Sequence, residues 1–498
     1  MTPRAKQDEV VSLVGPESVL HGKKSSSEKT SPPLRLWFSA LVLSLAGGFH
    51  FGYNLVLTNP AEMAFKQFLN SSIAASNEGL GADEESLDFR WSSYVSLLYV
   101  GSFLGAFLIQ PMADRLGRKR AVILSTAGQA VAVSVAILSY FLNSHIFYAA
   151  SRGLLGFFQA ITVGIAPMYM SECSPASCRG IISLSTGLFV QISIVFSSIL
   201  ASPQFLGSPS LWWALYAVEL GVLVVALAAL PFLPDSPSFL HSRGSMPDTS
   251  HSLSFFHGIS GYELEMTMES MREDSHDSSE TVGLLGLFKD SGARGRAFTG
   301  AVVMFGMIMG GIVVINAYAF RIFLTVGLDE SSAAWANVGI STIMVLGVAL
   351  SSLVIDRFGR RPLLLFTMSC VLLLNCVIVV LMYLFEADKD LLYGKLLIGV
   401  ICVYALVFSA GPAPLSFFIS AELCPQHVRG AAMTCAALIM AGGRSIVVAI
   451  YPPLVVKIHS AQAYGLLFIP ATLLCIVYLF FRFPETKPET EPSKIVED

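Results

Sequence analysis

The sequence predicts an all-α integral membrane protein in which twelve transmembrane helices form two six-helix bundles related by a pseudo-two-fold axis. Three observations predict this fold: the composition, the number of long apolar segments, and a repeat between the two halves of the chain. The 498 residues are 54% hydrophobic and 13% charged, and their mean hydropathy is +0.66. Because soluble domains carry roughly 25% charged residues, most of this chain is expected to lie in lipid.

Twelve apolar segments are long enough to cross a bilayer, which takes about 20 residues of helix. The first six are expected at about 37–57, 91–111, 121–142, 146–168, 183–202 and 211–231, and the second six at about 297–318, 335–355, 363–385, 395–418, 431–456 and 464–483. The chain therefore divides into a disordered cytosolic tail (1–36), a first bundle (37–232), a cytosolic loop (233–294), a second bundle (295–483) and a cytosolic tail (484–498).

The charges of the connecting segments predict the orientation of the helices. The polar N-terminal stretch lacks a short apolar core followed by a cleavage site, so we expect no signal peptide. Basic residues in two short loops, 114–120 and 356–361, place these loops and both termini in the cytosol. The loop 58–90 then faces outside, where Asn70-Ser71-Ser72 is a glycosylation acceptor sequence. We expect the protein in the plasma membrane.

Three landmarks recur in the same order in the two halves, which indicates a duplicated six-helix unit. The first is an Asp-Arg-x-Gly-Arg motif in the loop after the second helix of each half. The second is a Glu and Arg pair at equal spacing, and the third is a Pro-acid pair at an equal distance beyond that glutamate. The landmarks are Asp114–Arg118 and Asp356–Arg360, Glu172 with Arg179 and Glu422 with Arg429, and Pro234-Asp235 and Pro484-Glu485.

These charged clusters are expected at the cytosolic ends of the helices, where arginines pair with carboxylates across the two bundles and hold the cytosolic side closed. The alternative is that the basic loops only fix the topology. The glutamates favour a gate, because they add nothing to topology. The gate candidates are Asp114, Arg115, Arg118, Glu172, Arg179, Asp356, Arg357, Arg360, Glu422 and Arg429.

Composition and motifs argue against several other classes of protein. The net charge of −4 gives no reason to expect a nucleic-acid partner. The eight cysteines are scattered, mostly through apolar segments, so neither a disulfide framework nor a metal site is expected. We find no nucleophile with a base and no phosphate-binding loop, so we expect no cofactor and no enzyme activity.

Several motifs together resemble one family of membrane carriers. They span residues 49–54, 114–119, 167–172, 234–237, 359–361, 411–414 and 484–487, together with Arg152, Gln191 and Arg179. Over about 37–487 the chain resembles the sugar-porter branch of the major facilitator superfamily, and in detail its animal facilitative glucose and fructose transporters. The resemblance implies a carrier that exposes a site between its bundles to one side of the membrane at a time. Gln110, Ser352 and Ser238 depart from the family pattern in the cytosolic motifs.

The resemblance also implies where a sugar would bind. In the family a glutamine of the fifth helix binds sugar hydroxyl groups, and Gln191 matches it. The family's amides in helices 7, 8 and 11 fall here on apolar residues or on Arg444, and the tryptophan of helix 10 falls on Phe417. The substrate-binding candidates are Gln191, His50, Asn54, Tyr318, Asn316, Phe417 and Arg444.

Arg444 lies about midway through the expected helix 431–456, at a depth where an arginine is costly and is usually paired or functional. One interpretation is that it pairs with a carboxylate or with backbone carbonyls. The other is that it anchors a carboxylate or a urate-like anion. Glu219 is the other acid deep in a spanning segment, but we do not expect it to reach Arg444, because the sixth helix is peripheral in the family.

The family's proton symporters carry an aspartate directly after Phe-Gly-Tyr, where this chain has Asn54, which does not titrate. We therefore expect uniport of a sugar, a hexose-like small-molecule solute, by a protein that works as a monomer in the lipid bilayer. Two alternatives stay open. One is a carrier of a small organic anion such as urate, held by Arg444, and the other is a transport-silent sensor.

Overall fold

The computed structural model describes residues 33–75, 84–175, 178–277, 284–287, 291–424 and 426–485. Most of the two predicted cytosolic tails, of which 1–36 is expected to be disordered, lies outside these described residues. Within the described ranges every regular element is a helix, which confirms the predicted all-α class.

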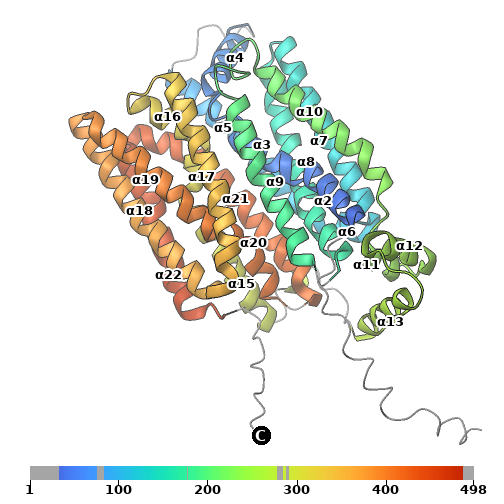
Figure 1. The fold of residues 1–498 in the computed structure, drawn as a ribbon. Helices are drawn as coiled ribbons and strands as arrows, with labels where there is room; N and C mark the ends of the chain where they lie inside the picture. Colours follow the sequence, from blue (N-terminus) through green and yellow to red (C-terminus); the bar gives the residue numbers. More distant parts are fainter. Residues whose placement is uncertain are drawn as a thin grey trace, which may run out of the picture.

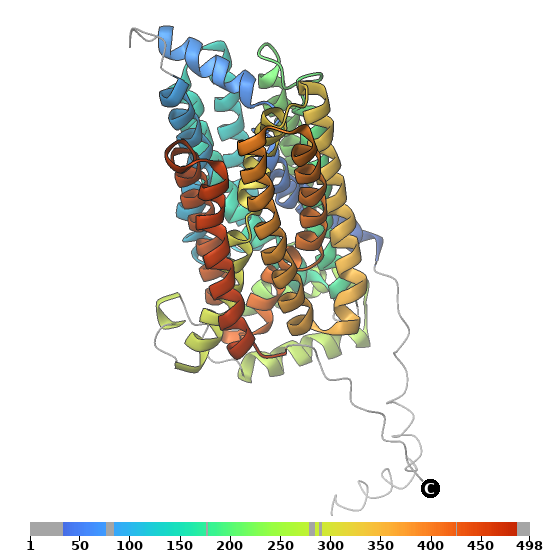
Figure 2. The same ribbon diagram turned by 90° about the vertical axis from the view of Figure 1, so that its left-hand side faces the viewer.

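The helices of the first half lie close to the predicted positions. The first span begins at Leu34 and breaks at Gly47, between α2 and α3. An additional helix, α4, lies within the predicted outer loop and crosses the upper end of the bundle (Figure 2). The helices are α2 (Leu34–Ala46), α3 (Gly48–Val56), α4 (Glu62–Ala75), α5 (Glu84–Ala106), α6 (Ile109–Leu116), α7 (Arg118–Phe141), α8 (His145–Cys173), α9 (Arg179–Leu200) and α10 (Trp212–Ala229).

The stretch 233–294, predicted as a cytosolic loop, contains short helices among its described residues. Local signals explain two of their ends. The Ser236 hydroxyl accepts a hydrogen bond from the Phe239 N–H at the start of α11, and Gly258, with φ of +70°, ends α12. These helices lie at the opposite end of the molecule from α4 (Figure 1). They are α11 (Pro237–Ser242), α12 (Met246–His257), α13 (Tyr262–Asp277) and α14 (Leu284–Leu287).

The second half repeats the pattern of long helices. Gly310-Gly311 and Gly411 divide two of its spans into half-helices, and Gly311 has φ of +101°, which residues with a side chain rarely adopt. The helices are α15 (Ser291–Met309), α16 (Ile312–Thr325), α17 (Glu330–Phe358), α18 (Arg360–Asp388), α19 (Leu391–Ala410), α20 (Pro412–Glu422), α21 (Gln426–Ile458) and α22 (Ser460–Arg482).

Ten helical segments of the described residues are long and apolar enough to cross a membrane. An eleventh span is the bent pair Ser86–Ala106 and Ile109–Leu116, whose two parts differ in direction by 47°. The shorter apolar segment Ser185–Leu200, within α9, occupies the place of the predicted fifth span. All twelve predicted segments therefore coincide with helices of the structure.

The two halves stand side by side, with the first half on the right and the second half on the left in Figure 1. Two helix pairs make most of the contact between them: α5 packs against α21, and α9 packs against α17. The outer and cytosolic ends are named here after the orientation predicted from charge, with α4 at the outer end and α11–α13 at the cytosolic end. The interface between the halves therefore runs along four long helices.

The repeated cytosolic motifs fold in the same way in both halves. Gly117 and Gly359, with φ of +86° and +85°, stand directly before α7 and α18. Asp235 accepts hydrogen bonds from the first two N–H groups of α7, both at 3.1 Å, and Glu485 accepts from the first two of α18, at 2.9 and 3.1 Å. A carboxylate there satisfies N–H groups that lack helical partners. The Pro-acid landmarks of the sequence thus cap helices that lie far from them in the chain.

Candidate functional site

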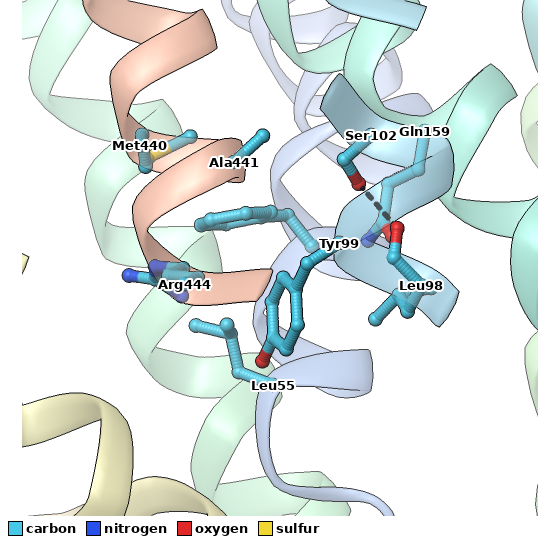
Figure 3. A pocket seen from close by; sticks show the side chains of 9 residues that line it. Leu55, Leu98, Tyr99, Ser102, Gln159, Met440, Ala441 and Arg444 are labelled. Carbon is cyan, nitrogen blue, oxygen red and sulfur yellow. Dashed lines mark hydrogen bonds between the residues drawn. The ribbon is translucent and has the colours of Figure 1, made fainter. Parts of the chain in front are cut away.

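A small central pocket lies between the two bundles (Figure 3). Its volume of about 20 Å³ is room for a water molecule but not for a sugar. A solute of sugar size therefore requires the bundles to separate. The lining residues are Phe51 and Leu55 of α3, Leu98, Tyr99 and Ser102 of α5, Gln159 of α8, and Met440, Ala441 and Arg444 of α21.

Arg444 is the charged group of the central pocket and stands in the middle of α21. Its guanidinium lies over the ring of Phe51, with the guanidinium carbon 5.6 Å from the ring centre, and it also interacts with the Tyr99 phenol. The residue is 7% exposed, and its Nε has no hydrogen-bond partner among the described residues. Within the same residues no carboxylate lies within 4.0 Å of it. A buried cation held by aromatic rings keeps its charge available for a ligand.

Gln159 is absent from the candidates predicted from the sequence, yet it lines the central pocket. It is 3% exposed, and its Nε2 has no hydrogen-bond partner in the described part of the chain. A buried amide without a partner is costly, so this group is available to a solute. The sequence contains a feature that could have identified Gln159 as a candidate ligand, because it is a glutamine within an apolar helix, as is Gln191.

Gln191 is a buried residue of α9, a helix that packs against α17 of the other half. Its Oε1 has no hydrogen-bond partner among the residues that the structure describes. In this conformation it is not one of the residues that line the central pocket. A buried acceptor without a partner is what a ligand for a sugar hydroxyl requires, and the role of Gln191 in binding stays a prediction.

His50 and Asn54, two further predicted ligands, face into the first bundle in this structure. His50 Nδ1 lies 3.4 Å from Oε1 of Glu219, and Asn54 Nδ2 donates to the same oxygen at 2.6 Å. Arg152 Nη1 donates to Asn54 Oδ1 at 3.4 Å. All four residues are buried, and we call them the first-half cluster. It explains the position of Glu219, which belongs to this cluster and not to Arg444.

The central pocket is lined instead by Phe51 and Leu55, which are the next residues along α3 after His50 and Asn54. One residue of helix is a rotation of about 100°. The α3 helix therefore presents an apolar face to the pocket and a polar face to α10. His50 and Asn54 do not line the central pocket in this conformation, and their role in solute binding stays a prediction.

Tyr318, Asn316 and Phe417 are the remaining predicted ligands. The Tyr318 hydroxyl donates to the carbonyl of Val448 at 3.3 Å, and its ring centre is 5.9 Å from that of Tyr451. Tyr318 lines a second cavity nearer the outer end, not the central pocket. Asn316 is partly buried in α16, and the side chain of Phe417 lies outside the described side chains.

Polar side chains of the second half hold the break between α15 and α16. The carbonyl of Gly310 accepts hydrogen bonds from Asn375 Nδ2 at 2.8 Å and from the Tyr404 hydroxyl at 2.7 Å. The Tyr464 hydroxyl donates to Asn375 Oδ1 at 2.9 Å, and Thr472 donates to the preceding carbonyl at 2.7 Å. Carbonyls freed by a broken helix need such partners inside a membrane. We call Asn375, Tyr404, Tyr464 and Thr472 the second-half clasp.

Neutral hydrogen bonds join the two bundles toward the outer end. Asn59 Oδ1 accepts from the N–H of Phe320 at 3.1 Å, and Asn59 Nδ2 donates to Asn337 Oδ1 at 3.2 Å. The hydroxyls of Ser198 and Ser341 are 2.9 Å apart. Each of these bonds has one partner in each half, so the outer end is closed in this conformation.

An ion-pair network also crosses between the bundles at the outer end. Arg321 of α16 lies 2.7 Å from Asp88 and 3.8 Å from Glu62, and Lys66 Nζ lies 2.5 Å from each of these carboxylates. We call these four residues the outer network. Arg321 belongs to the second half and the other three to the first, so opening of the outer end must separate Arg321 from both carboxylates.

At the cytosolic end, Arg118 pairs with Glu172 at 2.8 Å and lies 3.9 Å from Asp114. Ser236 also donates to Glu172, and the backbone carbonyl of Arg115 accepts from Arg243. These partners all belong to the first half, so the described pairs of the predicted gate stabilise one bundle and do not cross to the other. The backbone N–H of Arg360 donates to Glu485. The remaining gate candidates have side chains outside the described ones: Arg179, Asp356, Arg357, Glu422 and Arg429.

Asn70, the predicted glycosylation site, is exposed on α4 at the outer end. Ser72 of the same acceptor sequence is buried, because its hydroxyl accepts from the N–H of His145 at 2.8 Å and donates to the carbonyl of Asn143 at 2.7 Å. The folded chain thus leaves room for a glycan on Asn70 while the serine packs inward, and glycosylation stays a prediction.

Two bundles of membrane-crossing helices, with broken helices and a pocket between them, define a multi-pass membrane carrier. The family model described as "Sugar (and other) transporter" matches residues 39–491, so the chain belongs to this family of transporters. The match confirms the family predicted from the sequence, and this family is one of carriers, not of enzymes. The protein therefore handles a small-molecule solute within a lipid bilayer.

Known relatives extend over nearly the whole chain. The mouse (Mus musculus) protein "Solute carrier family 2, facilitated glucose transporter member 7" is 28% identical over 470 residues, which are 93% of this chain and 90% of the relative. The horse (Equus caballus) member 5 is 26% identical over 466 residues, 93% and 91% of the two chains. The xylose transporter XylE from E. coli, in a partially occluded inward open conformation, superposes with a TM-score of 0.73 at 18% identity over 92% of this chain and 100% of that one. The superposition confirms the two-bundle fold.

Proposed function

We propose that the protein is a facilitative carrier of a sugar of hexose size that works by alternating access. The observation that carries this proposal is the central pocket, which presents two buried polar groups without hydrogen-bond partners among the described residues, Gln159 Nε2 and Arg444 Nε. Sugar hydroxyls donate and accept hydrogen bonds, so they match amides set in an otherwise apolar wall. The relatives named as facilitated glucose transporters support the same solute class.

Alternating access is supported by where the two bundles touch. The bonds of Asn59 and the outer network close the outer end, and the central pocket is too small for a sugar. Release of these bonds would let the bundles rock apart at the outer end and enlarge the pocket toward the outside. A carrier that cycles needs such contacts to be individually modest, as hydrogen bonds and partly exposed ion pairs are.

Uniport is supported by the first-half cluster. Asn54 stands where the resemblance places the aspartate of proton symporters, and Asn54 does not titrate. Glu219 supplies a carboxylate beside it, but this group is held by His50 and Asn54 on the face of α3 opposite the pocket. We therefore propose that transport follows the solute gradient and does not need a proton gradient.

A second candidate solute is a small organic anion. The observation in its favour is Arg444, a buried guanidinium in the pocket with no carboxylate within 4.0 Å in the described part of the chain. A carboxylate or urate-like ring would satisfy this charge bidentately, which a neutral hexose does not. The two candidates differ in what Arg444 contributes: a hydrogen-bond donor for a sugar, or the essential charge for an anion.

We further propose a monomer in the plasma membrane with both termini in the cytosol and a glycan on Asn70. The basic loops support this orientation. The exposed position of Asn70 on α4, at the end opposite α11–α13, is compatible with a glycan outside the cell.

The test is uptake of labelled glucose, fructose and urate in a host that lacks its own hexose transporters. The proposal expects hexose uptake that Gln159→Ala and Gln191→Ala each reduce about tenfold, the effect of losing ~1.4 kcal/mol, while Gln462→Ala, an exposed amide of α22, serves as the control outside the pocket. Hexose uptake that neither Gln159→Ala nor Gln191→Ala reduces contradicts the proposed site. Urate uptake that Arg444→Asn abolishes, with no hexose uptake in the parent, establishes the anion carrier instead.

A further inference from the structure

A second, open cavity of about 1320 Å³ lies at the outer end of the molecule, separate from the central pocket. It is lined by α16, α18, α19 and α21, by Ser460 of α22, and by residues of α5 from the first half. Tyr318 and Tyr451 line it, and Arg444 does not. The cavity is large enough for a small organic molecule, and neither the fold nor the proposed sugar site uses it.

The carboxylates of this outer cavity already have partners. Asp88 receives Arg321 at 2.7 Å and Lys66 at 2.5 Å. Glu386 accepts hydrogen bonds from the Ser460 N–H, at 3.2 Å, and from the Ser460 hydroxyl. The acidic groups that line the cavity are therefore neutralised or hydrogen-bonded within the protein.

The cations of the cavity are less occupied. Lys389 and Lys457 line it with exposed side chains, and neither forms an ion pair with a described residue. Arg321 contributes a third cation whose side chain is 46% exposed although it pairs with Asp88. With Asp88 and Glu386 as the acids, the titratable lining other than His459 carries three positive and two negative charges, and both carboxylates are engaged. Lys389 and Lys457 are therefore the groups of the cavity that can attract an anion.

Aromatic rings form much of the remaining wall. Tyr318 and Tyr451 pack with ring centres 5.9 Å apart at its inner end, and Phe89, Tyr383 and Phe385 line it further out. Flat apolar groups pack well against such rings. The combination of free ammonium groups with aromatic walls selects a flat molecule that carries one negative charge.

We propose that the outer cavity binds a small aromatic carboxylate or a similar flat organic anion, with Lys389 and Lys457 holding its charge and the aromatic residues holding its ring. Arg321 connects this site to the interface between the bundles, because it belongs both to the cavity lining and to the outer network. A bound anion competes with Asp88 for Arg321 and so weakens one of the bonds that close the outer end. The site is independent of which solute the central pocket carries.

The test uses the full-length protein in phosphatidylcholine nanodiscs, which present no anionic lipid, and fluorine NMR line broadening of 4-fluorobenzoate. Neutral 4-fluorobenzyl alcohol is the matched ligand. We expect the carboxylate to bind at least about tenfold more tightly than the alcohol, a ratio that corresponds to ~1.4 kcal/mol. The double variant Lys389→Gln with Lys457→Gln should remove this difference, since both side chains are exposed and their loss leaves the core intact.

Two control variants locate the binding. Lys395→Gln changes an exposed lysine of α19 that does not line the cavity, and it should bind 4-fluorobenzoate as the parent does. Arg444→Asn should also leave this binding unchanged, because Arg444 lines the central pocket. Equal binding of the acid and the alcohol, undiminished binding by the double lysine variant, or loss of binding in Arg444→Asn alone would each overturn the proposal.

Discussion

The two bundles share a sequence repeat and capped helix starts, but they bury their polar groups in different ways. The first half buries ionisable residues together, with His50, Arg152 and Glu219 gathered around Asn54. The second half buries neutral amide and phenol groups, and it uses them to hold the carbonyls of the break between α15 and α16. Charged groups are expensive to bury unless paired, whereas the neutral clasp satisfies backbone groups that a broken helix leaves free.

This difference shows how one duplicated unit came to serve two tasks. In the first half, buried polar residues form contacts between α3, α8 and α10. These contacts hold one wall of the central pocket in place. The second half holds a discontinuous helix in place and contributes Arg444 as the pocket's charge. The first-half cluster is thus expected to matter most for stability, and the second half for opening and solute choice.

The largest expected effect comes from removing the carboxylate of the first-half cluster. Glu219→Ala leaves the side-chain amide of Asn54 without its acceptor and removes the buried carboxylate beside His50, so we expect stability to fall by about 3–5 kcal/mol. Glu219→Gln, which keeps the acceptor for Asn54, should cost less. The apparent melting temperature of the detergent-solubilised protein measures both, and an unchanged value for Glu219→Ala would show that the cluster does not stabilise the bundle.

The next largest effect on stability is expected at the glycines before α7 and α18, which occupy equivalent positions in the two halves. A Cβ at Gly117 would lie 2.5 Å from Asp235 and 2.6 Å from the Phe239 ring, while one at Gly359 would lie 2.9 Å from Glu485. Both have φ near +85°, where a side chain costs about 1–3 kcal/mol. We expect Gly117→Ala to lower the melting temperature more than Gly359→Ala.

The matched control for these glycines is Gly221→Ala in α10, where an added Cβ meets no atom within 4 Å. This variant should melt at or above the temperature of the parent, because alanine is the better helix former. A loss in Gly221→Ala as large as that in Gly117→Ala would contradict the explanation by backbone geometry.

A smaller effect is expected in the second half when the clasp is weakened. Asn375→Ala removes a donor to Gly310 and the acceptor of Tyr464, so we expect a loss of about 1–3 kcal/mol. Tyr404→Phe removes one hydrogen bond and should cost less. If Asn375→Ala destabilised the protein as much as Glu219→Ala, the charged first-half cluster would contribute no more stability than the neutral second-half clasp, which would contradict this comparison.

The smallest effect is expected at the outer network, where residues of the two halves contact each other. Arg321→Gln removes the cation that the second half contributes, and a partly exposed pair of this kind is worth about 0.2–1 kcal/mol. Even 1 kcal/mol shifts the open population only roughly fivefold. A membrane-impermeant maleimide should label Ser341→Cys faster in Arg321→Gln than in Arg321→Lys, which keeps the charge. Equal labelling rates would show that Arg321 does not restrain the outer end.

Much of the fold was predictable because membrane spans depend on apolar length, which is read directly along the chain. All twelve segments, and the repeat at Gly117 and Gly359, followed from such local patterns. The helices α4 and α11–α13 were not predicted, because short amphipathic helices outside the membrane leave a weak periodic signal. The acid caps by Asp235 and Glu485 were visible as repeated landmarks, but their role needed the folded chain.

The site was harder to predict than the fold, because the direction of a side chain depends on helix rotation. His50 and Asn54 carry the family motif, yet Phe51 and Leu55 line the pocket, one residue and about 100° away on α3. Gln159 is not among the predicted ligands, although its chemistry is that of Gln191. Arg444 was identified correctly as a buried mid-helix cation, because the cost of an arginine at that depth is independent of rotation.

The most direct test of the proposed function is net uptake of labelled hexose into proteoliposomes made with the purified protein. We predict that labelled hexose enters down its own gradient at the same rate with and without an imposed proton gradient, and that Gln159→Ala lowers this rate about tenfold. Entry that requires the proton gradient, or a rate that Gln159→Ala leaves unchanged, would contradict a uniporter whose solute site is the central pocket between the two bundles.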